Sequence, residues 1–149
     1  MQSLAQRLLV VEDDVTLARA LSRTLARRGF SVAVARSCTA ARSLTQSFDL
    51  AILDLDLPDG NGVDLARQLL DSAKVPGVMF FTGSTDLALL ARARRLGPLV
   101  MKSTGSEELL TLLSSSESAD PPESRTNPSR KSGSMRASSS SALRRSRAR

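Results

Sequence analysis

The sequence predicts an α/β fold, a five-stranded, doubly wound parallel sheet in a single domain. Short apolar runs alternate along the chain with segments that carry apolar residues at helical spacing, and this alternation is typical of strands joined by crossover helices. Parallel neighbours need such crossovers, which are right-handed, so helices are expected on both faces of the sheet. The five expected strands are residues 8–11, 32–34, 50–53, 78–81 and 99–101.

The first expected helix lies between the first two strands. Leu17, Leu21 and Leu25 recur at every fourth residue, arginines occupy another face, and Gly29 follows as a C-terminal stop. Similar spacing of apolar residues predicts further helices at 38–47, 62–72, 85–96 and 106–114.

The chain divides by composition into a folded part and a tail. Residues 1–115 hold 13 basic and 12 acidic side chains, whereas residues 116–149 hold 8 and 3, so most of the net charge of +6 lies in the tail. Apolar side chains nearly vanish after residue 114, and too little apolar area remains to offset chain entropy. We therefore expect one folded domain at 1–115 and a disordered, basic, Ser/Arg-rich tail at 116–149.

Three roles for this tail stay open. It is an inert remnant, a linker that in relatives leads to an effector domain, or a polyanion-binding arm that acts through the basic residues at 144–149. Since no helix-turn-helix sequence is present, specific DNA binding is not expected. Any binding to DNA should be weak, salt-sensitive and independent of sequence.

Composition also excludes several classes of site. The chain has no histidine, which removes histidine triads, histidine metal sites and phosphohistidine carriers. A single cysteine, Cys38, allows no internal disulfide, and the start of the chain lacks the apolar stretch of a signal peptide. No apolar run approaches the roughly 20 residues that span a bilayer. A cytoplasmic protein without a membrane span is therefore expected.

Chemically capable side chains follow four of the five expected strands. In a parallel α/β sheet, ligands bind at the carboxyl ends of the strands, so these residues should meet at one edge. They are Glu12, Asp13 and Asp14 after the first strand, Asp54 and Asp56 after the third, Thr82 after the fourth and Lys102 after the fifth.

Converging carboxylates would repel one another unless a cation lay among them. Ligand sets made only of oxygen favour Mg²⁺, which also accepts phosphate oxygens. With Mg²⁺ bound, Asp54 stays ionised and can attack a phosphoryl group, while the metal and the Lys102 ammonium neutralise the developing charge. The Thr82 hydroxyl can hydrogen-bond a phosphoryl oxygen.

Together these motifs resemble the response-regulator receiver family over about residues 6–114. The resemblance implies a flavodoxin-like receiver fold and a two-component phosphorelay switch, a signalling protein rather than a conventional enzyme. The matching segments are Leu9-Val10-Val11-Glu12-Asp13-Asp14, Leu53-Asp54-Leu55-Asp56-Leu57-Pro58-Asp59-Gly60-Asn61-Gly62, Phe81-Thr82-Gly83 and Lys102.

The same resemblance implies a role for each acidic residue. Asp54 corresponds to the phosphoacceptor, because it ends a strand four residues before Pro58. Asp13 corresponds to a direct Mg²⁺ ligand, Glu12 acts through metal-bound water, and the backbone carbonyl of Asp56 is a further ligand.

For the remaining residues, Thr82 corresponds to the switch hydroxyl and Lys102 to the phosphate-binding lysine. The implied phosphoryl donor is a sensor histidine kinase or a phosphotransfer protein. The resemblance names no downstream partner protein.

Three departures from the family pattern affect the expected signal output. Ser103 follows Lys102 where the family usually has proline, so Lys102 is expected to be held less tightly. Leu99 occupies the position where the family usually has a tyrosine or phenylalanine, whose ring moves when the threonine binds the phosphoryl group. The link at residues 96–99 is about two residues shorter than is usual in the family. The chemistry is expected to be retained and the output to be atypical.

Two other functions remain open at this stage. Leu99 and Ser103 are also consistent with a degenerate receiver that docks partners without phosphorylation. Asp54-Leu55-Asp56 resembles the paired aspartates of haloacid-dehalogenase phosphatases, although that motif normally follows a first strand.

Two motifs also have purely structural interpretations. Asp14 serves equally well as a helix cap, and residues 58–62 have the composition of an ordinary turn.

Overall fold

A computed structural model describes residues 5–118, and side chains up to residue 115. It contains a five-stranded parallel sheet in the order β2-β1-β3-β6-β7, so the predicted fold class is confirmed. The strands are β1 (Arg7–Val11), β2 (Ser31–Ala35), β3 (Leu50–Leu53), β6 (Val78–Thr82) and β7 (Leu99–Met101). All five predicted strands are present, with bounds that differ by at most one residue.

The helices follow the strands in alternation. They are α1 (Val15–Arg27), α2 (Cys38–Ser43), α3 (Gly62–Asp71), α4 (Leu87–Arg94), a short 3₁₀ helix, η1 (Lys102–Thr104), and α5 (Glu107–Ser118). Contacts group the chain into two units, Met1–Leu110 and Thr111–Arg149. The sheet and the candidate site belong to the first unit. Of the second, the structure describes only the rest of α5.

Alternation along the strands supplies a core on each face of the sheet. Leu9 and Val11 of β1 pack in one apolar cluster with Leu65 and Leu69 of α3. Leu8 and Val10 point to the opposite face, where α1 contacts β1 and β2, and both are almost completely buried. The sheet is therefore covered on both faces, as parallel sheets generally are.

Three helices differ from their predicted length by more than one residue. The helix expected at 85–96 spans only Leu87–Arg94. The segment at 38–47 is helical only to Ser43, because Leu44 takes an extended conformation and the Lys74 ammonium donates to the carbonyl oxygens of Arg42 and Leu44. These bonds satisfy carbonyl groups at the end of α2. The last helix continues to Ser118.

The predicted domain boundary at 115/116 lies inside α5. The expected disorder of the tail and its three possible roles concern residues that lie outside the described part. Within residues 5–118, no helix has the length and apolar character needed to cross a membrane.

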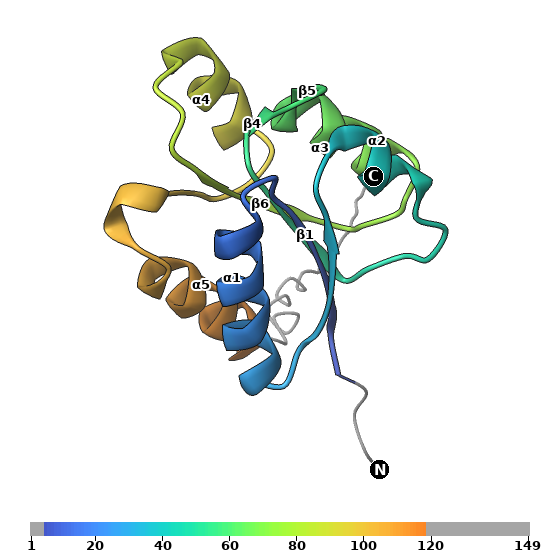
Figure 1. Cartoon of the computed structure of the whole chain (residues 1–149), viewed down its shortest axis with the longest axis vertical. Coiled ribbons are helices and arrows are strands. Elements are labelled where there is room, and N and C mark those ends of the chain that lie inside the picture. Colours follow the sequence, from blue (N-terminus) through green and yellow to red (C-terminus); the bar gives the residue numbers. More distant parts are fainter. Residues whose placement is uncertain (1–4, 119–149) are drawn as a thin grey trace, which may run out of the picture. The chain divides into compact units, whose positions relative to one another are not determined.

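The predicted turn after β3 contains a small hairpin. β4 (Asp56–Leu57) and β5 (Gly60–Asn61) pair in antiparallel fashion, with Asp56 opposite Asn61. The turn composition was interpreted correctly, but it did not predict these two short strands. The hairpin lies between the end of β3 and the start of α3 in the chain, and Figure 1 shows β5 beside α3.

Candidate phosphoryl-acceptor site

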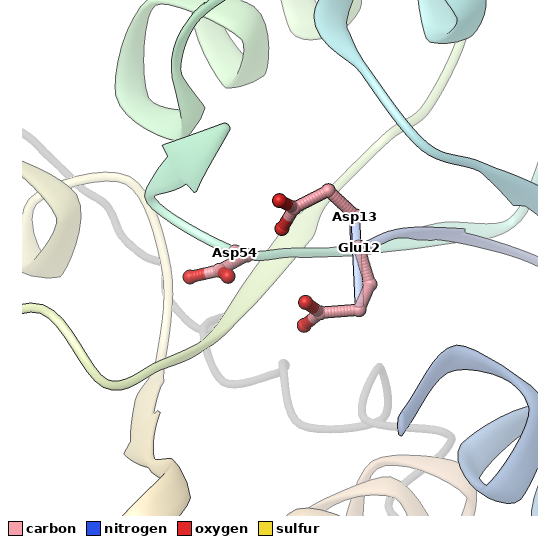
Figure 2. Close-up of side chains that lie close together, drawn as sticks. All are labelled: Glu12, Asp13 and Asp54. Atoms are coloured by element: carbon pink, nitrogen blue, oxygen red, sulfur yellow. The ribbon is translucent and has the colours of Figure 1, made fainter. Parts of the chain in front are cut away.

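Three acidic residues converge at the carboxyl ends of β1 and β3. Each of Glu12, Asp13 and Asp54 offers a carboxylate oxygen, and these oxygens lie within 4.8 Å of one another. Figure 2 shows the three carboxylates around a common space. All three ligands are oxygens, the donor type that Mg²⁺ prefers, so this donor set fits the metal that the sequence predicted.

The Asp54 carboxylate is buried and is contacted on both oxygens. Thr82 donates its hydroxyl hydrogen to Asp54 Oδ1 over 2.7 Å, and the Lys102 ammonium donates to Asp54 Oδ2 over 2.9 Å. Asp54 is only 5% exposed and Thr82 is fully buried. The structure thus brings together the three residues that the sequence placed at the ends of β3, β6 and β7.

Lys102 also pairs with Glu12. Its Nζ lies 2.9 Å from Glu12 Oε1, while Glu12 Oε2 accepts a hydrogen bond from the backbone N–H of Asp14 over 3.1 Å. Burial raises the pKa of Glu12 in spite of these bonds. Burial alone would lower the pKa of Lys102, but its hydrogen bonds to Asp54 and Glu12 outweigh this, and the pKa is raised.

The charge balance of the cluster favours a divalent cation. With all four groups ionised, the carboxylates of Glu12, Asp13 and Asp54 and the ammonium of Lys102 leave a local charge of −2. Magnesium would neutralise this charge, and like charges this close are costly without a counter-ion.

The neighbouring residues Asp13 and Asp14 have different roles. Asp14 is the N-cap of α1, and its Oδ1 accepts from the backbone N–H of Leu17 over 3.1 Å. The capping interpretation of Asp14 is confirmed. Asp13 is exposed and belongs to the acidic cluster instead.

Asp56 lies beside the cluster but outside it. Its carboxylate is exposed and is not one of the grouped acidic ligands, while its backbone N–H donates weakly to Asp54 Oδ1 over 3.4 Å. The sequence assigned Asp56 a role through its backbone carbonyl, and that assignment stays a prediction.

Two further residues shape the site. The buried Ser84 donates its backbone N–H to Thr82 Oγ1 over 3.1 Å, which orients the threonine hydroxyl. A Cβ atom at Gly62 would lie 2.1 Å from the carbonyl oxygen of Asp54, so only glycine allows α3 to begin this close to the acceptor. The turn composition contained Gly62, but composition alone did not indicate which backbone it approaches.

The departures from the family pattern have visible local consequences. Leu99 is half-buried and packs against the apolar core, and the Lys102–Ser103 peptide bond is trans. Lys102 nevertheless contacts both Asp54 and Glu12. A Cβ atom at Gly97 would lie 2.1 Å from the carbonyl oxygen of Val78, so the short link between α4 and β7 passes directly over the start of β6.

Comparison with known proteins agrees with this site. The chain belongs to the response regulator receiver domain family, whose model matches residues 8–114. It contains a receiver domain with an acidic pocket, consistent with a phosphoaspartate switch. Such a domain is a phosphoacceptor signalling module rather than a conventional enzyme.

Among curated proteins, the chain is similar to the DNA-binding response regulator MtrA of Mycobacterium bovis. The two are 43% identical over 90 residues, which is 58% of this chain and 38% of MtrA. The acid tolerance regulatory protein ActR of Rhizobium meliloti is 31% identical over 122 residues, which is 78% of this chain and 63% of ActR. The chain thus spans well under half of MtrA and less than two thirds of ActR.

Two solved structures illustrate the likeness in fold. The non-phosphorylated HemR receiver domain from Leptospira biflexa is 32% identical with a TM-score of 0.66, and the match covers 83% of this chain and 98% of that one. The response regulator TrrA from Thermotoga maritima, in complex with Mg²⁺ and BeF, is 22% identical with a TM-score of 0.65. The match covers 73% of this chain and 96% of the TrrA chain.

Proposed function

We propose that this chain is a cytoplasmic phosphorelay switch that accepts a phosphoryl group on Asp54 from a histidine kinase or a phosphotransfer protein. One observation carries the proposal. The buried Asp54 carboxylate has the Lys102 ammonium on one oxygen and the Thr82 hydroxyl on the other, beside the acidic pair Glu12 and Asp13.

In the proposed reaction, an Asp54 carboxylate oxygen attacks the phosphorus of a phosphohistidine on the donor. The new O–P bond forms as the P–N bond breaks, and the electron pair of that bond stays with the departing imidazole. Asp54 needs no base, because it attacks as a carboxylate. The Lys102 ammonium lies 2.9 Å from Asp54 Oδ2 and can stabilise the negative charge on the transferred oxygens.

Asp13 and Asp54 would hold Mg²⁺ directly, Glu12 would act through bound water, and the backbone carbonyl of Asp56 would complete the protein ligands. When bound, the metal would neutralise charge on the phosphoryl oxygens. The all-oxygen ligand set supports this assignment, as does the local charge of −2 that the cluster carries when its four groups are ionised.

Thr82 would transmit the effect of Asp54 phosphorylation to α4. Its hydroxyl oxygen accepts from the backbone N–H of Ser84, and Ser84 Oγ accepts from the backbone N–H of Asp86 over 3.2 Å. Asp86 in turn caps α4 through the N–H of Leu89. A threonine that turns toward a phosphoryl oxygen would therefore disturb the start of α4, where Leu87 is 80% exposed.

Phosphorylation by acetyl phosphate tests the proposal. We expect the chain, incubated with acetyl phosphate and Mg²⁺, to gain the mass of one phosphoryl group. Asp54→Asn should gain none, and removing Mg²⁺ with EDTA should abolish the gain in the parent chain. Asp56→Asn is the matched control, because it removes a neighbouring carboxylate but keeps the backbone carbonyl. An adduct on folded Asp54→Asn, or none on the folded parent chain, would overturn the proposal.

The docking module stays open as a second function because of Leu99. Leu99 is half-buried against the apolar core and has no aromatic ring, so the surface around β7 lacks the ring movement that would signal phosphorylation. Under this second function, beryllofluoride and Mg²⁺ would leave amide hydrogen exchange at the start of α4 unchanged. Slower exchange there would favour the switch.

A further inference from the structure

The hairpin of β4 and β5 carries Asp56 but has little stability of its own. Each strand has only two residues, and none of the six residues from Asp56 to Asn61 is buried. Isolated two-stranded hairpins are marginally stable in water. The position of the Asp56 carbonyl therefore depends on contacts that the hairpin makes with the rest of the fold.

The C-terminal end of the hairpin is attached to α3. Asn61 is the N-cap of that helix and accepts from the N–H of Asp64 over 2.9 Å, and the N–H of Gly62 donates to the carbonyl oxygen of Leu55 over 2.9 Å. These bonds fix where β5 ends. They do not reach the turn at Pro58 and Asp59.

Asp59 attaches that turn to α2, about twenty residues earlier in the chain. Its Oδ1 accepts from the backbone N–H of Cys38 over 2.7 Å, and its Oδ2 accepts from the N–H and the hydroxyl of Thr39 over 2.9 and 2.6 Å. Hydrogen bonds to a carboxylate are about twice as strong as neutral ones. A Cβ atom at Gly60 would lie 3.1 Å from Cys38 Sγ, so the hairpin also packs closely against the start of α2.

Helix α2 has a cap without Asp59. Ser37 is its N-cap, and Ser37 Oγ accepts from the backbone N–H of Ala40 over 3.0 Å. The bonds from Asp59 therefore add something that a local cap does not provide, a connection between the hairpin and α2.

We propose that Asp59 is a positioning residue for the metal site: by fastening the hairpin to α2, it holds the backbone carbonyl of Asp56 where it can bind Mg²⁺. This inference rests on the proposed function. Asp59 touches neither the metal nor the phosphoryl group. Its effect passes through the hairpin, and its removal should weaken metal binding while leaving Glu12, Asp13 and Asp54 in place.

Comparison of Asp59→Ala with Ser37→Ala provides the test, because both variants remove a cap from α2 but only the first releases the hairpin. Mg²⁺ dissociation constants of the full chain would be measured by isothermal titration calorimetry. We expect Asp59→Ala to bind Mg²⁺ about tenfold more weakly, as is common for residues that orient metal ligands. Ser37→Ala should match the parent chain. Amide exchange in the hairpin should be faster only in Asp59→Ala.

The titrations would be repeated in about 0.5 M KCl, where the screening length falls to about 4 Å and a distant charge has little effect. A loss that persists in high salt comes from the missing hydrogen bonds and supports the inference. A loss that disappears in high salt, or an equal loss in both variants, would overturn it while leaving the proposed function intact. No Mg²⁺ binding by the folded parent chain would overturn both.

Discussion

Replacing Lys102 with methionine removes the cation that contacts both Asp54 and Glu12. Each carboxylate lies 2.9 Å from the ammonium, and the two side chains are only 5% and 4% exposed. Removing one partner of a buried ion pair costs about 3–5 kcal/mol. The Lys102 side chain is itself 25% exposed, so solvent screens part of the interaction. We expect a loss of about 2–3 kcal/mol in the free energy of unfolding, or roughly 10 °C in Tm.

Magnesium and acid should both reduce this loss. The variant site has one more net negative charge, so we expect Mg²⁺ to stabilise the variant more than the parent chain. At ten times its dissociation constant, a ligand stabilises the folded state by about 1.4 kcal/mol. Burial raises the pKa of Glu12 and the hydrogen bond from Lys102 lowers it, so the pKa should be higher still without Lys102. The folded variant then takes up a proton more readily than the folded parent chain does, and the penalty should shrink as the pH falls.

Thermal and urea unfolding followed by circular dichroism, in EDTA and in Mg²⁺, would measure these effects. Lys74→Met is the matched control, because the Lys74 ammonium donates to backbone carbonyl groups and has no carboxylate partner among the described residues. The reasoning is refuted if Lys102→Met loses no more stability than Lys74→Met, or if Mg²⁺ stabilises Lys102→Met no more than the parent chain.

Three further predictions concern Gly62, Cys38 and Asp59. Gly62→Ala should lose about 1–3 kcal/mol in urea unfolding, since the new methyl group would meet backbone at 2.1 Å. Burial, and then the nearby charge of Asp59, raise the pKa of the Cys38 thiol, so Ellman's reagent at pH 8 should modify the native chain far more slowly than the urea-unfolded chain. Hydrogen bonds, first from the Thr39 hydroxyl, hold the pKa of Asp59 well below its usual range. Asp59 therefore contributes stability above its unfolded pKa that is lost as the pH falls through the folded value, and Asp59→Asn should be destabilised at pH 7 and progressively less below about pH 4.

Each of these has its own control. Gly77→Ala places a methyl group 3.9 Å from a leucine carbon, an ordinary contact, and should change stability little. Equal losses for the two glycine variants would contradict the steric argument. Native Cys38 reacting as fast as a small free thiol would contradict its burial. An Asp59→Asn deficit that stays constant from pH 7 to pH 3 would mean that the charge of Asp59 plays no part.

The sheet and the edge of the site could be predicted from local patterns. An apolar run of four or five residues, such as Leu50–Leu53, indicates a buried strand without any knowledge of its neighbours. Once the strands are parallel, their carboxyl ends must lie at one edge, so Asp54 and Lys102 were expected at the same edge. Their contact over 2.9 Å crosses the intervening strand β6 and depends also on the order of the strands in the sheet.

Local patterns left two roles open for Asp14 and could not predict the end of α2. Both a helix cap and a part in the acidic site were compatible with the position of Asp14, and the structure shows the cap. The end of α2 depends on Lys74, which lies about thirty residues later. Nothing within one turn of Leu44 indicates that contact.

The sequence by itself therefore determined the fold class, the family and the group of residues that meet at the end of the sheet. The spacing of apolar residues and the alternation of strands and helices can both be seen along the chain. Only the tertiary structure decided which atoms touch: Thr82 and Lys102 on opposite oxygens of Asp54, and Asp59 on the start of α2. Such contacts join residues 20 to 48 positions apart. They depend on the register and packing of whole elements, which no local pattern of residues contains.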